Sequence, residues 1–351
     1  MMEIFVVNII LVLFYAVLIN CIPHVSTAKK NKLFIVICGI QLFIIHCFKD
    51  FSSLSDLTNY VGGYNYISQS KISQIFDIDF SVRFEPGWII LNKILSYISD
   101  NYLILFAVTS FVIILGYSKL ILLYSAIPWL SVFLFLTYIF IPSLYILRQH
   151  LALAILLFSL PYIVKRRFLK FLLVVLLAIS MHFTAIVFLI AYFIYPVTIG
   201  KKFWITFATF VFVSRFLIAP LLLYLMSMNE GYARYLDYLA TNSTDFFISL
   251  CVLGLFVYST KVSRLEGIYK LFFLLYCAAI IIAIGGIGVP MVGRFNLYFL
   301  VFAIILIPNA LIKIQLPLRC LVIVCVMYFF LKLAFSESSI TEHGNFRLLF
   351  M

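Results

Sequence analysis

The sequence predicts an all-α polytopic membrane protein, and two observations carry this prediction. The chain of 351 residues is 65% hydrophobic and only 11% charged, and its apolar residues fall in runs of roughly 15 to 24 residues, long enough to cross a bilayer as helices. Runs such as "FLLVVLLAIS" and "LYFLVFAIILI" do not alternate apolar with polar residues, as the strands of a membrane barrel would. We therefore exclude a barrel.

Hydropathy, read together with proline, glycine and charge clusters, predicts about twelve membrane-spanning helices. We expect them near residues 3–22, 33–48, 102–118, 126–142, 149–164, 168–181, 183–199, 203–226, 246–260, 268–287, 295–311 and 318–335. Residues 87–99 are short and contain Asn92 and Lys93, so we predict an external re-entrant or interfacial helix there. The whole chain, 1–351, then forms a single integral-membrane domain with external loops at 49–86 and 227–245.

The distribution of charge predicts the orientation. Fifteen of the 25 Lys and Arg residues fall in alternate loops, which the positive-inside rule assigns to the cytoplasm. Nearly all acidic residues fall in the other loops, and an even number of spans places both termini outside. A crossing helix at 87–99 would turn the basic clusters outward, which favours the re-entrant interpretation. The net charge of +12 is dispersed between apolar runs, so a nucleic-acid partner is not expected.

The first external loop contains the aromatic sequence "DLTNYVGGYNY". Asp56, Tyr60 and Tyr64 are spaced i, i+4, i+8 and share one face if this segment is helical, although Gly62 and Gly63 weaken such a helix. Two interpretations are open for the tyrosines: a substrate surface, or a belt of aromatic residues at the headgroup level.

The same loop ends in "RFEPGW", which places a base and an acid before a Pro-Gly turn. Pro86 suits the first turn of a helix, and Trp88 is expected to anchor at the membrane interface. Arg83 and Glu85 either form a local ion pair or act on a substrate. Residues spaced i, i+2 do not face each other on a helix, which favours the second interpretation.

Three further residues interrupt apolar surroundings. Arg148, followed by Gln149, is predicted at the external end of a span, where snorkelling to headgroups is the alternative to a functional role. His182 is predicted at an external turn and is either a hydrogen-bonded structural residue or a group for proton transfer. Arg215 is the one charged residue predicted near the bilayer centre, and such a residue indicates a functional or pairing role.

Two later external segments add charged residues. "NEGYARYLDYL" contains Arg234 and Asp237, whose i, i+3 spacing also fits a local ion pair. "GGIGVPMVGRFNLYF" places Arg294 after a glycine-rich turn, and because no Gly-Lys-Ser/Thr follows, these glycines do not form a P-loop.

Together these residues predict an arginine-rich external site that also holds carboxylates and a histidine. Guanidinium groups stay charged and present several fixed N–H donors to phosphate oxygens, and a nearby carboxylate or imidazole is suited to accept a hydroxyl proton. In a helical membrane domain this combination indicates a substrate with a lipid tail, a diphosphate and a polar head. The cysteines show no metal-binding spacing. No metal site is predicted among the candidate residues, and no cofactor is expected.

The order of these motifs resembles the Wzy-type polysaccharide polymerases, particularly the EpsG-like branch. The resemblance covers about residues 50–300 and rests on five short motifs. They are Asp-x3-Tyr-x3-Tyr (Asp56, Tyr60, Tyr64), Glu-Pro-Gly-Trp (Glu85 to Trp88), Arg-Gln-x2-Ala (Arg148, Gln149, Ala152), His-x-Thr-Ala (His182, Thr184, Ala185) and Arg-Phe-x2-Tyr-Phe (Arg294 to Phe299). The chain departs from the family at "KDFSSLSD", where an Arg-x-Gly-x-Asp sequence is expected before Asp56.

The resemblance implies a metal-independent glycosyltransferase in the bacterial inner membrane. It implies transfer of a glycan from undecaprenyl diphosphate to the non-reducing-end sugar of another lipid-linked repeat unit, in O-antigen, capsule or exopolysaccharide synthesis, with the active site facing the periplasm or exterior. The expected partners are these lipid-linked oligosaccharides, membrane lipids and a chain-length regulator.

The candidate site residues take two roles. Proton acceptance is expected from Glu85 first, with Asp56 and His182 as alternatives. Binding of diphosphate or glycan is expected from Arg148, Arg294, Arg83, Arg234, Tyr60, Tyr64, Gln149 and Asp237. Three other functions compete: a lipid-linked oligosaccharide flippase or other transporter, a membrane O-acyltransferase, and an O-antigen ligase.

Overall fold

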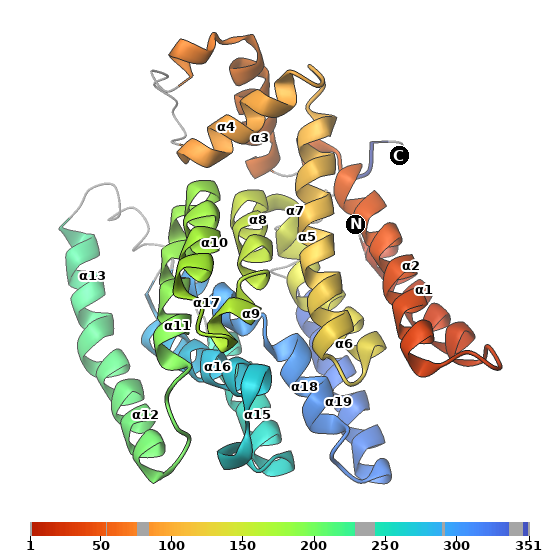
Figure 1. Ribbon diagram of the computed structural model, residues 1–351, viewed down its shortest axis with the longest axis vertical. Helices are drawn as coiled ribbons and strands as arrows, with labels where there is room; N and C mark the ends of the chain where they lie inside the picture. The colour runs from red at the N-terminus through yellow and green to blue at the C-terminus, as the bar shows by residue number, and fades with distance from the viewer. Residues whose placement is uncertain are drawn as a thin grey trace. The chain divides into compact units, whose positions relative to one another are not determined.

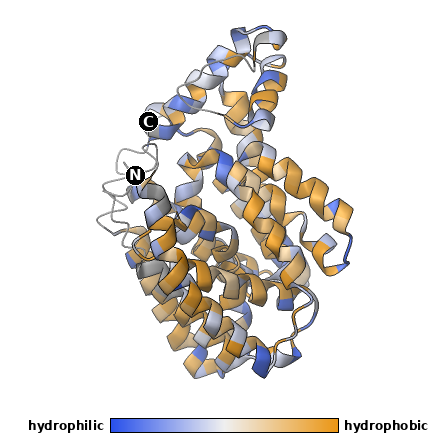
Figure 2. Cartoon of the chain, turned by 90° about the vertical axis from the view of Figure 1, so that its left-hand side faces the viewer, coloured by the Kyte–Doolittle hydropathy of each residue, from blue (hydrophilic) through white to orange (hydrophobic). Residues whose placement is uncertain are grey.

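The computed structural model describes residues 2–53, 55–75, 84–228, 243–289, 292–336 and 347–349. Within these ranges every extended regular element is a helix, and the one strand-like pairing is a bridge between Lys49 and Leu348. The prediction of an all-α protein is therefore confirmed for the described residues. Figure 2 shows that the helices are largely hydrophobic, with hydrophilic residues toward helix ends and connections.

Seven of the described helical segments are long and apolar enough to cross a membrane, and a bent pair makes an eighth if it counts as one span. The seven are Glu3–Asn20, Thr27–Cys47, Leu103–Tyr124, Pro128–Tyr145, Lys201–Tyr224, Gly267–Gly285 and Leu316–Ala334, and the bent pair is Val292–Leu300 with Ala303–Leu311, at 41°. This makes a multi-pass membrane protein, but the predicted count of about twelve is not confirmed.

Four predicted spans, 149–164, 168–181, 183–199 and 246–260, correspond to apolar helices of fewer than 18 residues. The helices are Leu147–Leu157, Phe168–Met181, Phe183–Ile194 and Ser243–Ser259, of which Phe168–Met181 has the predicted bounds. A helix of 14 residues such as Phe168–Met181 is about 21 Å long, less than the roughly 30 Å of the hydrocarbon core. The sequence 149–164 is interrupted because one helix ends at Leu157 and another starts at Leu160 with Pro161 in its first turn.

The contacts of the chain group into two compact units, and the single membrane domain expected from the sequence stays a prediction. The first unit contains Met1–Phe158, Leu173–Phe183 and Leu316–Met351, and the second contains Ser159–Leu172 and Thr184–Gln315. Helix α10 (Phe168–Met181) and the 3₁₀ helix η4 (Phe183–Leu189) contribute residues to both.

The first unit is a helical bundle with two short helices beside it (Figure 1). Its elements are α1 (Met2–Asn20), α2 (Thr27–Cys47), η1 (Phe51–Ser53), α3 (Ser55–Gln69), η2 (Ile72–Gln74), α4 (Pro86–Ser96), α5 (Leu103–Tyr124), α6 (Pro128–Leu134), the π-helical η3 (Phe135–Phe140), α7 (Ile141–Tyr145), α8 (Leu147–Leu157) and α19 (Leu316–Ala334). Helix α5 is central because it packs against both α2 and α8. Gly116 allows the close approach to α8: a Cβ there would lie 3.1 Å from the Ala154 carbonyl oxygen.

The short helix expected near 87–99 is α4, which has 11 residues. It packs against α3, the helix that carries Asp56, Tyr60 and Tyr64. Helix α3 continues through Gly62 and Gly63. Gly63 lies against the ring of Phe84, which leaves no room for a side chain at this position.

The second unit is built around α16 (Gly267–Gly285). Its other elements are α9 (Leu160–Val164), α11 (Ile190–Ile194), α12 (Lys201–Val213), the π-helical η5 (Ser214–Ile218), α13 (Ala219–Ser227), α15 (Ser243–Ser259), η6 (Val262–Arg264), α17 (Val292–Leu300) and α18 (Ala303–Leu311). Helices α9, α11, α12, α15, α17 and α18 all pack against α16. The stack of Phe272 on Phe302, with ring centroids 5.0 Å apart, joins α16 to the turn between α17 and α18.

Candidate functional site

The candidate site lies in the first unit, at the amino-terminal end of α4. Glu85 is the residue before this helix and has extended backbone angles, and Pro86 occupies the first helical turn, where its missing N–H leaves no bond unmade. The Glu85 carbonyl accepts the N–H of Ile89 at 3.1 Å, so the carboxylate projects from the end of the helix.

Gly87 explains how this end of α4 reaches α10. A Cβ on Gly87 would lie 2.6 Å from the Cβ of Ser180 and 2.8 Å from its carbonyl oxygen, so only glycine permits this approach. Ser180 is two residues before His182. The Pro-Gly pair therefore starts a helix and also brings Glu85 to His182.

Three donors meet at the Glu85 carboxylate. Its Oε1 atom lies 2.9 Å from Nδ1 of His182 and accepts the backbone N–H of Phe183 at 3.0 Å, and Oε2 accepts a hydrogen bond from Nη1 of Arg148. The side chains of Glu85, Arg148 and His182 are 15–17% exposed. We call these three residues the charged cluster. It is largely buried and still reaches the surface of its unit.

The surroundings of Glu85 favour its ionised form. Burial by itself raises the pKa of the carboxyl, but the hydrogen bond from His182, the charge of Arg148 and the N–H of Phe183 outweigh it, and the pKa of Glu85 lies below its usual value. Because the carboxylate is the acceptor, His182 is assigned the tautomer with its proton on Nδ1. Its Nε2 atom makes no hydrogen bond to any described residue and is then the nitrogen that can accept a proton.

Aromatic rings enclose the guanidinium of Arg148, which lies in the first turn of α8. The centre of this group is 4.9 Å from the ring centroid of Phe84 and 5.8 Å from that of Tyr60, both within the range of cation–π attraction. Trp88 packs on Tyr60 with ring centroids 5.4 Å apart. The expectation that Trp88 anchors at the membrane interface is wrong, because its side chain is fully buried.

The remaining predicted residues of the first unit lie outside the charged cluster. Asp56 is on an exposed part of α3. Tyr64 is fully buried, and its hydroxyl donates to the Ser99 carbonyl oxygen at 2.6 Å, which indicates a structural role. Gln149 and His150, next to Arg148, are buried within the unit.

The second unit contains Arg294, which is exposed on α17. On the same helix, the Tyr298 hydroxyl lies 2.9 Å from Oγ1 of Thr184. This bond joins the His-x-Thr-Ala and Arg-Phe-x2-Tyr-Phe motifs. Arg83, Arg234 and Asp237 lie outside the described residues.

Sequence reasoning missed the contributions of Phe84, Ser180 and the Phe183 backbone. Phe84 precedes Glu85 and Phe183 follows His182. This position next to a motif residue is the one feature of the sequence that could have indicated them. In the described residues no group of three or more His, Cys, Asp or Glu residues is placed to hold a metal ion. Metal independence stays a prediction.

Comparison with known proteins gives the family of the chain. No curated protein and no solved structure matches it. The model of the EpsG family matches residues 32–347, which include every member of the charged cluster. Because this match covers most of the sequence, the chain belongs to the EpsG family.

Proposed function

We propose that this protein is a membrane glycosyltransferase that polymerises lipid-linked oligosaccharide repeat units. It transfers a glycan from undecaprenyl diphosphate to the non-reducing-end sugar of another lipid-linked unit, at the external face of the bacterial inner membrane. Membership of the EpsG family supports a polysaccharide-polymerase function. The observation that carries the chemical proposal is the charged cluster, in which Glu85 holds both Arg148 and His182.

The chemistry requires a base for the acceptor sugar. An acceptor hydroxyl oxygen attacks the anomeric carbon of the donor glycan, and the bond between that carbon and the diphosphate oxygen breaks. The bonding electrons leave with the diphosphate, and the hydroxyl proton goes to the base. In this proposal Nε2 of His182 takes the proton.

Glu85 then orients and stabilises His182. A carboxylate that accepts from Nδ1 of an imidazole holds the ring in one tautomer and stabilises the cation that forms when Nε2 is protonated. Glu85 was expected to be the proton acceptor, but its three hydrogen bonds and lowered pKa make it a weak base. The geometry therefore favours His182 for this step, and Asp56 is not part of the cluster.

Arg148 keeps Glu85 ionised and in place. Its guanidinium already donates to Glu85, so any contact with the diphosphate is made beside this ion pair. Arg294, exposed on α17 of the second unit, is proposed separately as a residue that binds a diphosphate. Fixed guanidinium donors stabilise the charge that develops on a leaving diphosphate, and a chain-length regulator is the proposed protein partner.

The test compares the surface glycan of cells that carry one variant each in place of the native gene. His182→Asn keeps a side-chain N–H that can face Glu85 and removes the atom that takes the proton. We expect isolated repeat units on the normal lipid core instead of polymer, with the variant protein at wild-type level in the membrane. His24→Asn is the matched control, because His24 is exposed in a turn with φ of 59°, which asparagine also tolerates.

Other outcomes would contradict the proposal. Polymer of normal length and amount in His182→Asn would exclude His182 as the base. Loss of every repeat unit after deletion of the gene would indicate a flippase. Normal chain length with loss of an acyl decoration would indicate an acyltransferase, and free polymer that is not joined to its final acceptor would indicate a ligase.

A further inference from the structure

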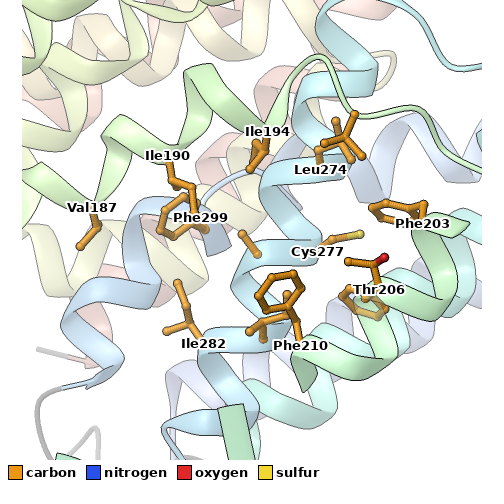
Figure 3. Close-up of a pocket in the computed structure, with 14 residues that line it drawn as sticks. Val187, Ile190, Ile194, Phe203, Thr206, Phe210, Leu274, Cys277, Ile282 and Phe299 are labelled. Carbon is orange, nitrogen blue, oxygen red and sulfur yellow. The ribbon is translucent and has the colours of Figure 1, made fainter. Parts of the chain in front are cut away.

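The second unit contains an apolar groove that the proposed chemistry does not use. Its volume is about 370 Å³. Helix α16 forms one wall, α12 forms another, and the segment from η4 to α11 closes it (Figure 3). The residues that line it are Val187, Ile190, Ile194, Val197, Phe203, Thr206, Phe207, Phe210, Leu274, Cys277, Ala278, Ile281, Ile282 and Phe299. We call it the α12–α16 groove.

The lining of the groove suits an aliphatic or isoprenoid chain. Thr206 carries the one hydroxyl among the lining residues, and no lining side chain is charged. A ligand with a polar body would lose its hydration there without finding hydrogen-bond partners, which is unfavourable. The side chains of α12 remain accessible along the wall, since none of its residues is buried.

Two arginines lie beyond the Ile282 end of this groove. Arg215 donates from Nη1 to the carbonyl oxygen of Ile287 at 2.8 Å, just past the end of α16. The first residue of α17, Val292, lies against Gly286 at the same end of α16. Arg294 follows in the first turn of α17.

The spacing on α17 joins the arginine end to the groove. Arg294 is five residues before Phe299, which lines the groove, and five helical residues rise about 7.5 Å. Because five residues also turn the helix by about 140°, an anionic headgroup at Arg294 would reach the groove lining through its attached tail. Arg215 is half-buried and keeps its charge at the same end of α16.

The π-helical segment η5 explains why Arg215 lies at the end of α16. The sequence places this arginine midway along an apolar run, but the backbone widens at Ser214–Ile218. Ser214 donates to the Ile281 carbonyl oxygen at 2.9 Å and lies against Gly285. Such widened turns are frequent at functional sites, and here the turn sets Arg215 against the end of α16.

We propose that the α12–α16 groove holds the polyisoprenoid tail of the lipid carrier, with Arg215 and Arg294 binding its diphosphate. Naming this lipid rests on the proposed function. The assignment gives Arg215 a substrate-binding role and places the tail along α12. It also states which end of the groove takes the headgroup.

The opposite end of the groove is cationic as well and provides an internal comparison. Lys201 and Lys202 start α12, and Lys270 of α16 lies over the ring of Tyr195, with its Nζ 5.4 Å from the centroid. The positive-inside rule assigns these lysines to the cytoplasmic face. The proposed reaction is external, so the headgroup is assigned to the arginine end.

The test uses the full-length protein in lipid nanodiscs with undecaprenyl diphosphate that carries a photoreactive group in its tail. We expect cross-links to peptides of α12 and α16. Thr206→Trp fills the groove and should reduce cross-linking at least tenfold. Ile205→Trp adds the same bulk to the neighbouring residue, which is 68% exposed and does not line the groove, and should leave cross-linking unchanged.

A second set of variants tests the end of the groove. Arg215→Ala and Arg294→Ala should each weaken binding of the diphosphate probe about tenfold, the loss of one strong charge-assisted contact. A tail-labelled polyisoprenol without phosphate should not distinguish them from wild type. The pair Lys201→Ala and Lys202→Ala should not change binding of the diphosphate probe.

Three results would overturn the inference. Equal cross-linking in Thr206→Trp and Ile205→Trp would exclude the groove. Competition by phosphatidylglycerol as strong as that by undecaprenyl diphosphate would make the groove a site for bilayer lipid. Loss of binding in the lysine variants alone would place the headgroup at the other end. Binding is measured without turnover, so a His182→Asn variant that still polymerises would contradict the proposed function and leave this inference intact.

Discussion

The two units hold their arginines in different ways. In the first unit, Arg148 is paired with the carboxylate of Glu85. In the second, Arg166 donates to the carbonyl oxygen of Tyr192 and lies 3.8 Å from the centroid of its ring, and Arg215 donates to the carbonyl oxygen of Ile287. In the first unit Glu85 also pairs with His182.

This difference separates two uses of a guanidinium group. An arginine paired with a carboxylate adds little net charge, so Arg148 mainly fixes the residues around it. An arginine held by a carbonyl oxygen is positioned but keeps its full positive charge, which makes it suited to an incoming anion. We therefore expect Arg148 to act through Glu85, and Arg215 to act on an anion.

Arg148→Ala should give the largest effect on stability, because it leaves the largely buried Glu85 carboxylate without its counter-charge. We expect the free energy of unfolding to fall by on the order of 3 kcal/mol, with complete loss of polymer. Thermal unfolding of the purified protein in detergent measures the first effect. The double variant Arg148→Ala with Glu85→Gln should recover part of the stability but none of the activity. An additive loss in the double variant would show that the two residues do not interact.

Gly87→Ala should destabilise the first unit by about 1 to 3 kcal/mol, the usual range for overpacking. Its Cβ would overlap Ser180, push α4 away from α10 and separate Glu85 from His182. Gly62→Ala is the matched control, since nothing lies within 4 Å of a Cβ at that position of α3. There the replacement should be neutral or slightly stabilising. Equal losses in the two variants would show that the contact with Ser180 is not responsible.

Arg215→Ala should cost only about 1 kcal/mol in stability, the typical contribution of one hydrogen bond. Its effect should appear instead as weaker binding of the lipid diphosphate. The same thermal measurement compares it with Arg148→Ala. A loss of stability as large as that of Arg148→Ala would mean that Arg215 is paired with an opposite charge in the folded protein. The difference between the two units described above would then be contradicted.

Acidification should give the smallest effect and should act on the first unit. The pKa of Glu85 is lower in the folded protein than its ordinary value of 4.5, so its ionisation stabilises the fold above that value. This contribution is lost as the pH falls through the folded pKa. Melting temperatures of wild type and Glu85→Gln, measured between about pH 6 and pH 3, should therefore converge at the acidic end. A constant difference over this range would contradict the assignment.

Much of the fold follows from local signals that need no tertiary information. The apolar runs mark the long helices, and Pro86 marks the start of the short helix α4. Helix α10 has the predicted bounds, but α8 ends at Leu157 instead of residue 164, because hydropathy does not show where a helix ends inside an apolar region. The widening at Ser214 depends on contacts with Ile281 and Gly285, about 70 residues away in the chain, so no local pattern contains it.

The sequence predicts which residues form the charged cluster, but it does not predict how these residues contact one another. Short motifs identify Glu85, Arg148 and His182. Arg148 and His182 follow Glu85 by 63 and 97 positions, so their contact with it depends on the fold. The proposal that His182 rather than Glu85 takes the proton depends on the contact between Nδ1 of His182 and Oε1 of Glu85, which the sequence does not show. The need for glycine at position 87 follows from Ser180, which carries no signal of its own in the sequence.

The composition of the first unit from separate stretches of chain has a consequence for biosynthesis. The chain leaves this unit after Phe158 and returns to it at Leu173. At a synthesis rate of 5–20 residues per second, the 97 residues between Glu85 and His182 take roughly 5 to 20 s to make. During that interval the nascent chain carries the acid and then its arginine without the histidine. The cluster is therefore completed late, and a ribosome that stalls before Leu173 leaves a chain that contains Glu85 and Arg148 but not His182.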